Sequence, residues 1–174
     1  MPDHQIRVTT SEDLPELSAL YRDAFPEEDL WPLVSALLSE ETIILSNVAL
    51  SNGTISGHIV FTFCDTIESG SQGALLGPLA VDPAQQGDGV GTALVQDGVA
   101  RLGRLATRQI FVLGDPGYYA RFSFASEHHV RPPCPIPEAW APAWQSQTLP
   151  GRKPLPPGIL HLPEPWRDPS LWAP

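Results

Sequence analysis

A glycine-rich run between residues 86 and 92 is the part of the sequence best suited to chemistry. An apolar stretch ends shortly before it, at Val81, and residues with helical spacing follow it. The first turn of a helix leaves backbone N–H groups without partners and carries partial positive charge. Glycines let a phosphate approach such a backbone closely, so the run predicts a pyrophosphate site, with a tight ligand-free turn as the alternative. The candidate ligand-binding residues are Gln86, Gly87, Asp88, Gly89, Val90, Gly91 and Thr92.

Two well-known phosphate-binding patterns do not fit this run. The chain contains no G-x-x-x-x-G-K-[ST] segment, which a nucleoside triphosphate site would need. A dinucleotide pattern G-x-G-x-x-G that starts at Gly87 would need a glycine where the chain has Thr92. A dinucleotide site is also expected near the first strand of a βαβ series, whereas about 85 residues precede this run. We therefore expect a different phosphate-bearing ligand.

The elements that must position the run follow from hydrophobic spacing. Asn52-Gly53 lies between two apolar runs, which is a strong signal for a β-hairpin because both residues tolerate positive φ. Thr10 and Asp13 have the spacing of a capping box at a helix start. In chain order we expect a strand over 5–9, two helices over about 11–25 and 30–38, strands over 43–51, 54–64 and 74–81, a helix over about 90–107, a strand over 109–113 and a short helix.

The last part of the chain differs in composition. Thirteen of the twenty prolines lie between residues 132 and 174, a density that excludes long helices and central strands. Segments 143–149 and 158–162 can still form edge strands. The region also contains four tryptophans that we expect to pack against the rest of the chain. They are Trp140, Trp144, Trp166 and Trp172. We predict a core over 1–130 and a Pro/Trp-rich extension over 131–174 that completes the same domain.

Charge and cysteine content restrict the environment and the partners. The formal net charge of −10 argues against nucleic-acid binding, because phosphate contacts rely on clustered Lys and Arg. No apolar stretch approaches the ~20 residues that span a bilayer, and the first residues lack the pattern of a signal peptide. The two cysteines, Cys64 and Cys134, indicate no disulfide framework. We expect a cytoplasmic protein that binds neither nucleic acid nor membranes.

Two motifs together resemble one known family. Gln86-x-x-Gly89-x-Gly91, preceded by Val81-x-Pro83, resembles the acyl-CoA signature [QR]-x-x-G-x-[GA] of the GNAT superfamily. The run 114–124, Gly-Asp-Pro-Gly-Tyr-Tyr-Ala-Arg-Phe-Ser-Phe, resembles the G-D-P-x-Y-Y-x-R-F-G-F block of the YhbS-like branch of predicted acetyltransferases. The resemblance covers about residues 5–125. It implies a single α/β (α+β) domain of GNAT type, with a mixed central β-sheet flanked by helices.

The resemblance also implies roles for individual residues. It points to an N-acetyltransferase that moves an acetyl group from acetyl-CoA to an amine by direct transfer in a ternary complex. The pyrophosphate would lie on the backbone of residues 86–92, and the pantetheine arm along Leu79, Ala80 and Val81. The Val81 N–H would polarise the thioester carbonyl, and Tyr119 would protonate the leaving thiolate. A CoA-binding GNAT-fold module with weak or regulatory activity is the alternative.

Other roles stay open at the level of sequence. The family's glycine before the last aromatic residue is Ser123 here, and a serine at positive φ costs about 1 kcal/mol, so we expect a local adjustment. The general base is open among Asp65, Glu68, His58 and Asp82. We expect no metal site, because the adjacent histidines at 128 and 129 point apart on most backbones. The acceptor and the oligomeric state, including a homodimer, also stay open.

The distribution of charge leaves two further alternatives. Residues 1–41 contain ten acidic side chains and only two basic ones, Arg7 and Arg22. The acidic side chains form either a solvated face or an acidic rim that attracts a cationic acceptor. Arg101, Arg104 and Arg108 form either a solvated basic face or contacts for the 3′-phosphate of CoA.

Overall fold

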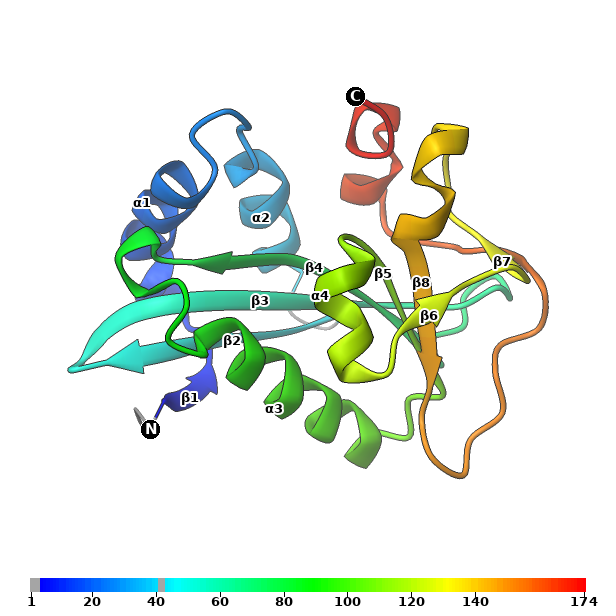
Figure 1. Cartoon of the computed structure of the whole chain (residues 1–174), viewed down its shortest axis with the longest axis horizontal. Coiled ribbons are helices and arrows are strands. Elements are labelled where there is room, and N and C mark those ends of the chain that lie inside the picture. The colour runs from blue at the N-terminus through cyan, green and yellow to red at the C-terminus, as the bar shows by residue number, and fades with distance from the viewer. Residues whose placement is uncertain (1–3, 41–42) are drawn as a thin grey trace. The chain divides into compact units, whose positions relative to one another are not determined.

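The computed structural model describes residues 4–40 and 43–174. Within these residues, seven strands form one mixed sheet in the order β1-β2-β3-β4-β5-β8-β6, and β7 and β9 form a separate parallel pair (Figure 1). The strands are β1 (Gln5–Val8), β2 (Ile44–Ser51), β3 (Thr54–Cys64), β4 (Gly73–Val81), β5 (Gln109–Leu113), β6 (Ala125–Ser126), β7 (Val130–Arg131), β8 (Trp144–Thr148) and β9 (Gly158–Ile159). The predicted class, a mixed sheet flanked by helices, is confirmed.

Helices lie in several of the connections between the strands, and two short ones follow the last strand. The α-helices are α1 (Leu14–Ala24), α2 (Trp31–Leu38), α3 (Val90–Arg104) and α4 (Pro116–Tyr119). The 3-10 helices are η1 (Ser11–Asp13), η3 (Pro83–Gln85), η4 (Ala120–Phe122), η5 (Glu138–Ala143), η6 (Glu164–Arg167) and η7 (Pro169–Leu171). None of the helices in the described part of the chain is long and apolar enough to cross a membrane.

The described residues pack into two compact units. The first unit comprises the residues up to Phe61 together with Gly77–Arg101, and the second comprises Thr62–Leu76 and Leu102–Pro174. Each unit therefore contains segments that are distant in sequence. The predicted division into a core over 1–130 and an extension over 131–174 stays a prediction.

In the first unit, α1 and α2 cover one face of the strands. Leu17, Leu20 and Tyr21 follow the i, i+3, i+4 spacing of an amphipathic helix and are buried. They join a hydrophobic cluster with Val34 of α2 and Val48 of β2. The apolar face of α1 is therefore the face that the structure buries.

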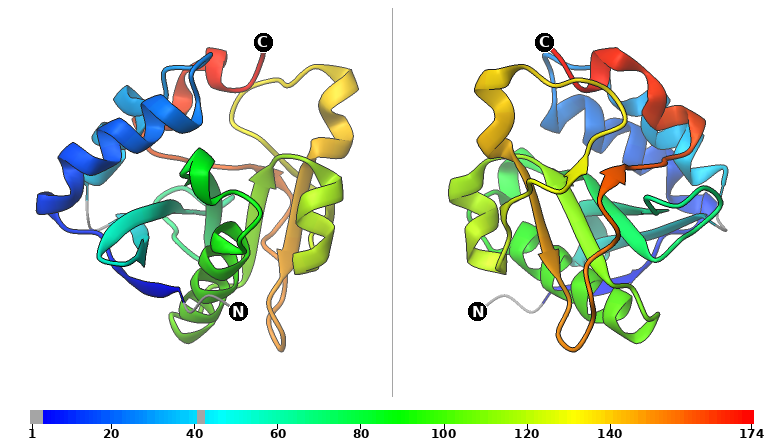
Figure 2. Two further views of the ribbon diagram at one scale, coloured as in Figure 1. Left: turned by 60° about the vertical axis from the view of Figure 1, so that its left-hand side comes forward. Right: turned by 90° about the vertical axis from the view of Figure 1, so that its right-hand side faces the viewer.

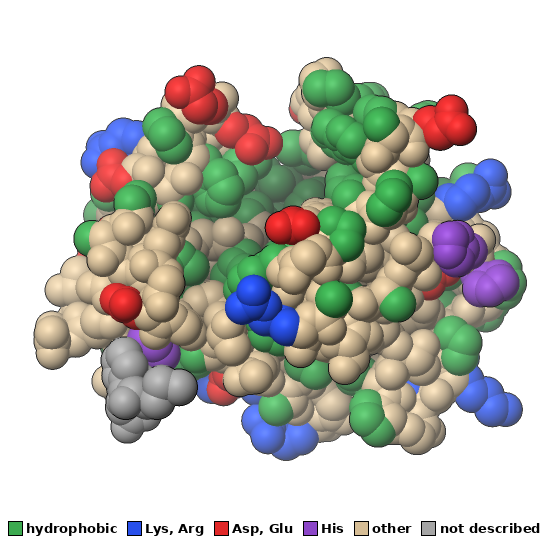
Figure 3. Space-filling model, in the orientation of Figure 1, with side chains coloured by type: hydrophobic (Ala, Val, Ile, Leu, Met, Phe, Trp, Pro, Cys, Tyr) green, Lys and Arg blue, Asp and Glu red, His purple; other side chains and the backbone are tan. Residues whose placement is uncertain are grey.

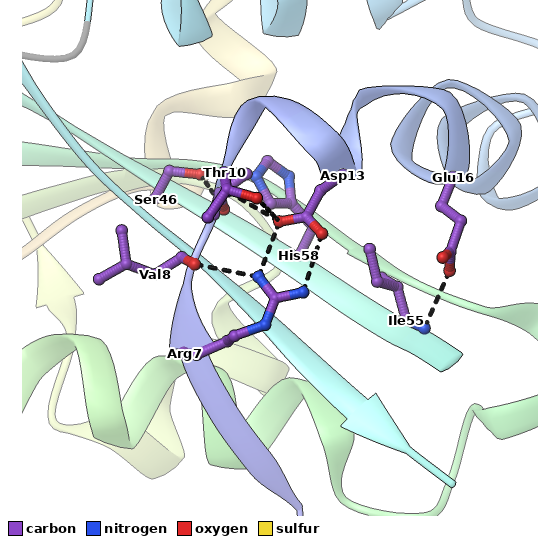
Figure 4. Close-up of polar contacts among 9 residues, drawn as sticks. Arg7, Val8, Thr10, Asp13, Glu16, Ser46, Ile55 and His58 are labelled. Carbon is purple, nitrogen blue, oxygen red and sulfur yellow. Dashed lines mark hydrogen bonds and ion pairs between the residues drawn. The ribbon is translucent and has the colours of Figure 1, made fainter. Parts of the chain in front are cut away.

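Polar contacts fix the start of α1 to two strands (Figure 4). The Arg7 guanidinium donates two hydrogen bonds of 2.8 Å to the Asp13 carboxylate, and the Thr10 N–H donates to the same carboxylate at 2.8 Å. Asp13 therefore serves as the predicted capping residue, and the hydrogen bond from Arg7 holds its pKa below the ordinary value. Glu16 accepts a hydrogen bond of 3.1 Å from the Ile55 N–H. These contacts tie α1 to β1 and β3.

Strand β3 separates two helical layers of the first unit (Figure 2). A Cβ atom added to Gly98 of α3 would overlap the ring of Phe61, so this glycine lets α3 approach β3 closely. His58, three residues earlier on the same strand, instead contacts Tyr21 of α1. The alternation of a strand thus directs neighbouring residues to opposite helices.

The second unit is built around β5. Residues 73–76 of β4 pair with it in parallel, and β8 pairs with it antiparallel on the other side. Because β8 also pairs with β6, the expectation that segment 143–149 forms an edge strand is wrong. No proline occurs from Trp144 to Thr148, so all five N–H groups can take part in pairing.

The tryptophans of the last segment form a buried group in the second unit. Trp144, Trp166 and Trp172 are 3%, 8% and 2% exposed, whereas Trp140 is only half-buried. The Trp172 ring lies 5.9 Å from the ring centroids of both Trp144 and Trp166, and its indole N–H donates to the Trp166 carbonyl at 2.8 Å. The chain after residue 160 is thus held by aromatic packing.

We expect Trp172→Ala to lower the free energy of unfolding by about 3–5 kcal/mol, because it removes a large buried side chain and leaves a cavity. Chemical denaturation of the full chain measures this loss. Trp140→Ala is the matched control and should cost clearly less. Equal losses in the two variants would show that burial of Trp172 is not what holds the segment.

Candidate functional site

The glycine-rich turn joins the end of β4 to the start of α3. Asp82 caps η3 by accepting a hydrogen bond of 3.0 Å from the Ala84 N–H. Gly87 and Gly89 follow at φ +88° and +84°, values that L side chains rarely adopt. A Cβ atom at Gly87 would meet nothing within 4 Å, and one at Gly89 only His4 Nε2 at 3.8 Å. Backbone conformation therefore requires these glycines, while the space outside the turn is open.

The turn is held in place by hydrogen bonds that leave the start of α3 available. His4 Nε2 lies 2.9 Å from the Asp88 carbonyl oxygen, and the Asp88 N–H donates to Gln85 O at 3.2 Å. The Ala93 N–H donates to Gly89 O at 3.0 Å, as the first bond of the helix. The N–H groups of residues 89–92, which precede Ala93, lack an intrahelical partner because they belong to the first turn of the helix. This is a cradle of the kind that binds phosphate oxygens.

The last residues of β4 lie beyond its pairing with β5. That pairing ends at Leu76, and Leu79, Ala80 and Val81 follow it. Ala80 is buried, whereas Leu79 and Val81 are half-buried. Extended backbone of this kind can pair with an extended ligand, as an added strand would. These three residues and residues 86–92 all belong to the first unit.

Tyr119 belongs to the second unit and is held by its neighbours. Asp115 caps α4 by accepting from the Gly117 N–H at 2.9 Å. The Tyr119 ring lies 4.9 Å from Tyr118 and 5.8 Å from Phe124 between centroids. Its hydroxyl makes no hydrogen bond among the described residues. Burial, and secondarily the neighbouring Tyr118, raises the pKa of Tyr119 well above its ordinary value, so the phenol stays protonated through the neutral range.

Ser123 lies directly after this aromatic cluster, at φ +71° and ψ +21°. The serine therefore adopts the left-handed conformation that a glycine would favour at this position. The expected local adjustment is not observed, and the substitution leaves the turn intact at a cost of about 1 kcal/mol.

Three of the four candidate bases have structural roles. His58 is fully buried, with Nδ1 2.7 Å from the Tyr21 hydroxyl and Nε2 2.7 Å from Ser46 Oγ. Burial lowers the pKa of His58 to about 3, so it is neutral at physiological pH and both nitrogens are engaged. Asp65 accepts hydrogen bonds from the backbone of its own turn, and Asp82 caps η3. Glu68 lies in an exposed loop and remains a candidate for the general base.

The arginines near the end of α3 are partly engaged within the protein. Arg101 pairs with Asp97 at 2.8 Å. Arg108 donates to the carbonyl oxygens of Lys153 and Pro154 at 2.8 and 2.7 Å, so it holds the last segment of the chain. Arg104 is exposed. Among the described residues, no three His, Cys, Asp or Glu side chains are grouped as a metal site would require.

Comparison with known proteins gives the family. The profile of the Acetyltransferase (GNAT) family matches residues 11–122. The chain belongs to the GNAT acetyltransferase family. This finding confirms the family that the two motifs indicate, and with it the class of enzyme, an acyltransferase.

Curated relatives and solved structures agree with this GNAT assignment. The chain is 34% identical over 150 residues to the uncharacterized N-acetyltransferase YjhQ of Escherichia coli K12, with 82% of each chain covered. It is 33% identical over 129 residues to the uncharacterized N-acetyltransferase YhbS of the same strain, with 72% of this chain and 77% of YhbS covered. The crystal structure of E. coli YhbS in complex with CoA matches with a TM-score of 0.80, 28% identity and coverage of 97% and 94%. The crystal structure of a Brucella melitensis GNAT acetyltransferase in complex with acetyl-CoA matches with a TM-score of 0.75 and 26% identity. This match covers 95% of the chain and 99% of the Brucella protein.

Sequence reasoning missed two features of this GNAT chain. His4 contacts the glycine-rich turn from 84 positions away, a distance at which no local pattern links two residues. Gly114 lies against the Tyr119 ring, since a Cβ atom there would be 2.5 Å from Tyr119 Cε2. The G-D-P motif contains this glycine, but the motif does not reveal that the glycine contacts the tyrosine ring.

Proposed function

We propose that this chain is an acetyl-CoA-dependent N-acetyltransferase, located in the cytoplasm, that acts on an amine. The observation that carries the proposal is the turn from β4 to α3, where Gly87 and Gly89 at positive φ leave an open cradle at a helix start. Two neighbours of 26–28% identity bind CoA or acetyl-CoA in their crystals. The pyrophosphate is assigned to the backbone of residues 86–92 and the pantetheine arm to Leu79, Ala80 and Val81.

The proposed reaction is a direct transfer. The neutral amine forms a bond to the thioester carbon, and the Val81 N–H stabilises the oxyanion. The C–S bond then breaks as Tyr119 donates its proton to the sulfur, and the proton that leaves the amine nitrogen passes to solvent, from which Tyr119 is reprotonated. The products are the acetamide and CoA thiol.

The cysteines support a route without an acyl-enzyme. A covalent route needs an activated thiolate. Burial, and secondarily the charge of Asp65, raises the pKa of the Cys64 thiol well above its ordinary value, so this group stays protonated. Cys134 Sγ donates to the Arg167 carbonyl at 3.7 Å and has no histidine partner among the described contacts. Neither thiol has the surroundings of a nucleophile.

Turnover of acetyl-CoA with a panel of amines tests the proposal. CoA thiol released only when an amine is present, together with an acetylated amine seen by mass spectrometry, is the expected result. Binding of CoA without any transfer would instead support the alternative, a CoA-binding module with regulatory activity.

We expect Gly114→Ala to lower kcat at least about tenfold with CoA affinity little changed, because the new methyl group displaces the Tyr119 ring and misplaced catalytic groups lose rate steeply. Gly103→Ala is the matched control, since a Cβ there meets nothing within 4 Å. Steady-state kinetics on both variants, beside calorimetric CoA binding, provide the measurement. A Gly114→Ala enzyme with the kcat of the control would argue against a fixed Tyr119.

A further inference from the structure

A pocket of about 380 Å³ lies where α1 ends and α2 begins, within the first unit. Three aromatic residues line it, and the Tyr21 ring lies 6.0 Å from Phe25 and 6.2 Å from Trp31 between centroids. The Tyr21 hydroxyl is bonded to His58 Nδ1, so its polar end is already used. Aromatic carbon therefore forms part of the pocket wall.

Two carboxylates stand at the same pocket. Glu28 and Asp29 line it, both are exposed, and neither side chain has a hydrogen-bond or ion-pair partner among the described residues. Arg22, which also lines the pocket, is paired with Asp23 at 3.3 Å. Figure 3 shows acidic side chains gathered over the connection between α1 and α2. The lining thus carries unpaired negative charge beside aromatic rings.

Aromatic rings and unpaired carboxylates together favour one kind of ligand. Ring faces attract cations, and the carboxylates add direct attraction. Glu27, in the same connection, adds a further exposed acidic side chain. Anions are repelled, and neutral groups gain only ring packing. The chemistry of the lining therefore selects an ammonium group.

We infer that this pocket binds an alkylammonium group of the acceptor, and that the acceptor is a molecule with two amines. This inference rests on the proposed acetyltransferase function. The amine that attacks a thioester must be neutral, whereas carboxylates and rings stabilise the protonated form of whatever amine they hold. One nitrogen cannot meet both demands at once. Tyr21 shares a hydrophobic cluster with Ala80 of β4, where the pantetheine arm is proposed to lie, and Phe25 and Trp31 pack against that cluster. The pocket therefore holds the second amine, which keeps its proton, while the first one reacts.

Binding of 1,5-diaminopentane to the full chain in the presence of CoA tests the pocket without any turnover. Nuclear magnetic resonance of the Trp31 indole N–H, assigned with Trp31→Phe, reports on the pocket itself. We expect the diamine to shift this signal and 1-pentanol to bind at least about tenfold more weakly. Pentanoate should have no effect. Equal binding of 1-pentanol, or an unmoved Trp31 signal at saturating diamine, would overturn the inference.

A matched set of charge-neutral variants tests the carboxylates. Glu28→Gln combined with Asp29→Asn changes exposed side chains without changing their size, so the fold should be retained. We expect the combined variant to bind the diamine at least about tenfold more weakly. Glu27→Gln removes a charge from the same connection without touching the pocket lining and should change affinity less than about twofold. Equal losses would reduce the effect to general surface charge and overturn the inference.

Kinetics separate this inference from the function on which it rests. In the combined variant, we expect the KM for the diamine to rise by the same factor of about ten, with kcat little changed. An unchanged KM with ongoing transfer would overturn the pocket and leave the acetyltransferase. Hydrolysis of acetyl-CoA without transfer to any amine, in a chain whose Trp31 signal still responds to the diamine, would overturn the proposed function. The role of the pocket in holding an acceptor would then be wrong as well.

Discussion

Replacement of Gly89 by glutamate is expected to weaken CoA binding by about 10²–10⁴-fold. Each charge-assisted hydrogen bond from the turn to a phosphate is worth roughly 1.5–3 kcal/mol, and a factor of ten corresponds to about 1.4 kcal/mol. A glutamate would fill the open side of the cradle and place a negative charge where the pyrophosphate is proposed to lie. Loss of two such bonds accounts for the expected factor. Isothermal titration calorimetry with CoA measures it.

Two further variants separate charge and space from backbone strain. Gly89 has φ +84°, so any side chain there costs about 1–2 kcal/mol in conformation alone. Gly53, in the hairpin turn between β2 and β3, has φ +76° and equally open surroundings. Gly53→Glu should therefore show the same strain with full CoA affinity, and Gly89→Ala should lie between the extremes. If Gly89→Glu binds CoA as the wild-type chain does, the phosphate assignment is wrong.

Much of the fold could be predicted because its signals are local. Asn52 and Gly53 have positive φ values of 51° and 76° and join β2 to β3, as the dipeptide between apolar runs indicates. Thr10 and Asp13 mark the beginning of the first helical segment by direct hydrogen bonding. Such features depend on residues a few positions apart, which a single sequence displays.

The arrangement of the last segment could not be predicted in the same way. The prolines around Trp144–Thr148 suggest an edge strand, yet this strand pairs with β5 and β6 on its two sides. The partner of a strand is chosen by contacts between distant residues, such as Leu113 opposite Trp144. A local pattern gives the extended conformation and cannot give the neighbour.

The candidate site shows the same limit. The glycine-rich turn is legible because positive φ nearly requires glycine, and Tyr119 because a motif surrounds it. His58 is chemically suited to be a base, and only the structure reveals Tyr21 and Ser46 at its two nitrogens. Residue type suggests what a side chain can do, whereas burial and partners decide whether it is free to do it.

Tyr119→Phe is expected to lower kcat by roughly 10²–10⁴-fold, the usual contribution of a general acid. The substitution removes only the hydroxyl, so the ring contacts with Tyr118 and Phe124 are retained. CoA affinity should be nearly unchanged, because the proposed binding residues are on other elements. Tyr118→Phe is the matched control, and we expect it to change kcat less than about tenfold. Steady-state kinetics and calorimetry on the two variants give the comparison.

The pH profile of the wild-type chain supplies an independent test of the same role. Activity should rise with pH as the amine loses its proton, and fall only when Tyr119 loses its own. An exposed phenol would give this fall near pH ~10, the ordinary pKa of tyrosine. Because burial raises the pKa of Tyr119, we expect the fall at a higher pH. Tyr119→Phe should abolish the fall together with most of the rate. A variant that keeps full kcat, or a Cys134→Ala variant that abolishes transfer while the wild-type chain accumulates an acetylated cysteine, would exclude direct transfer with Tyr119 as the acid.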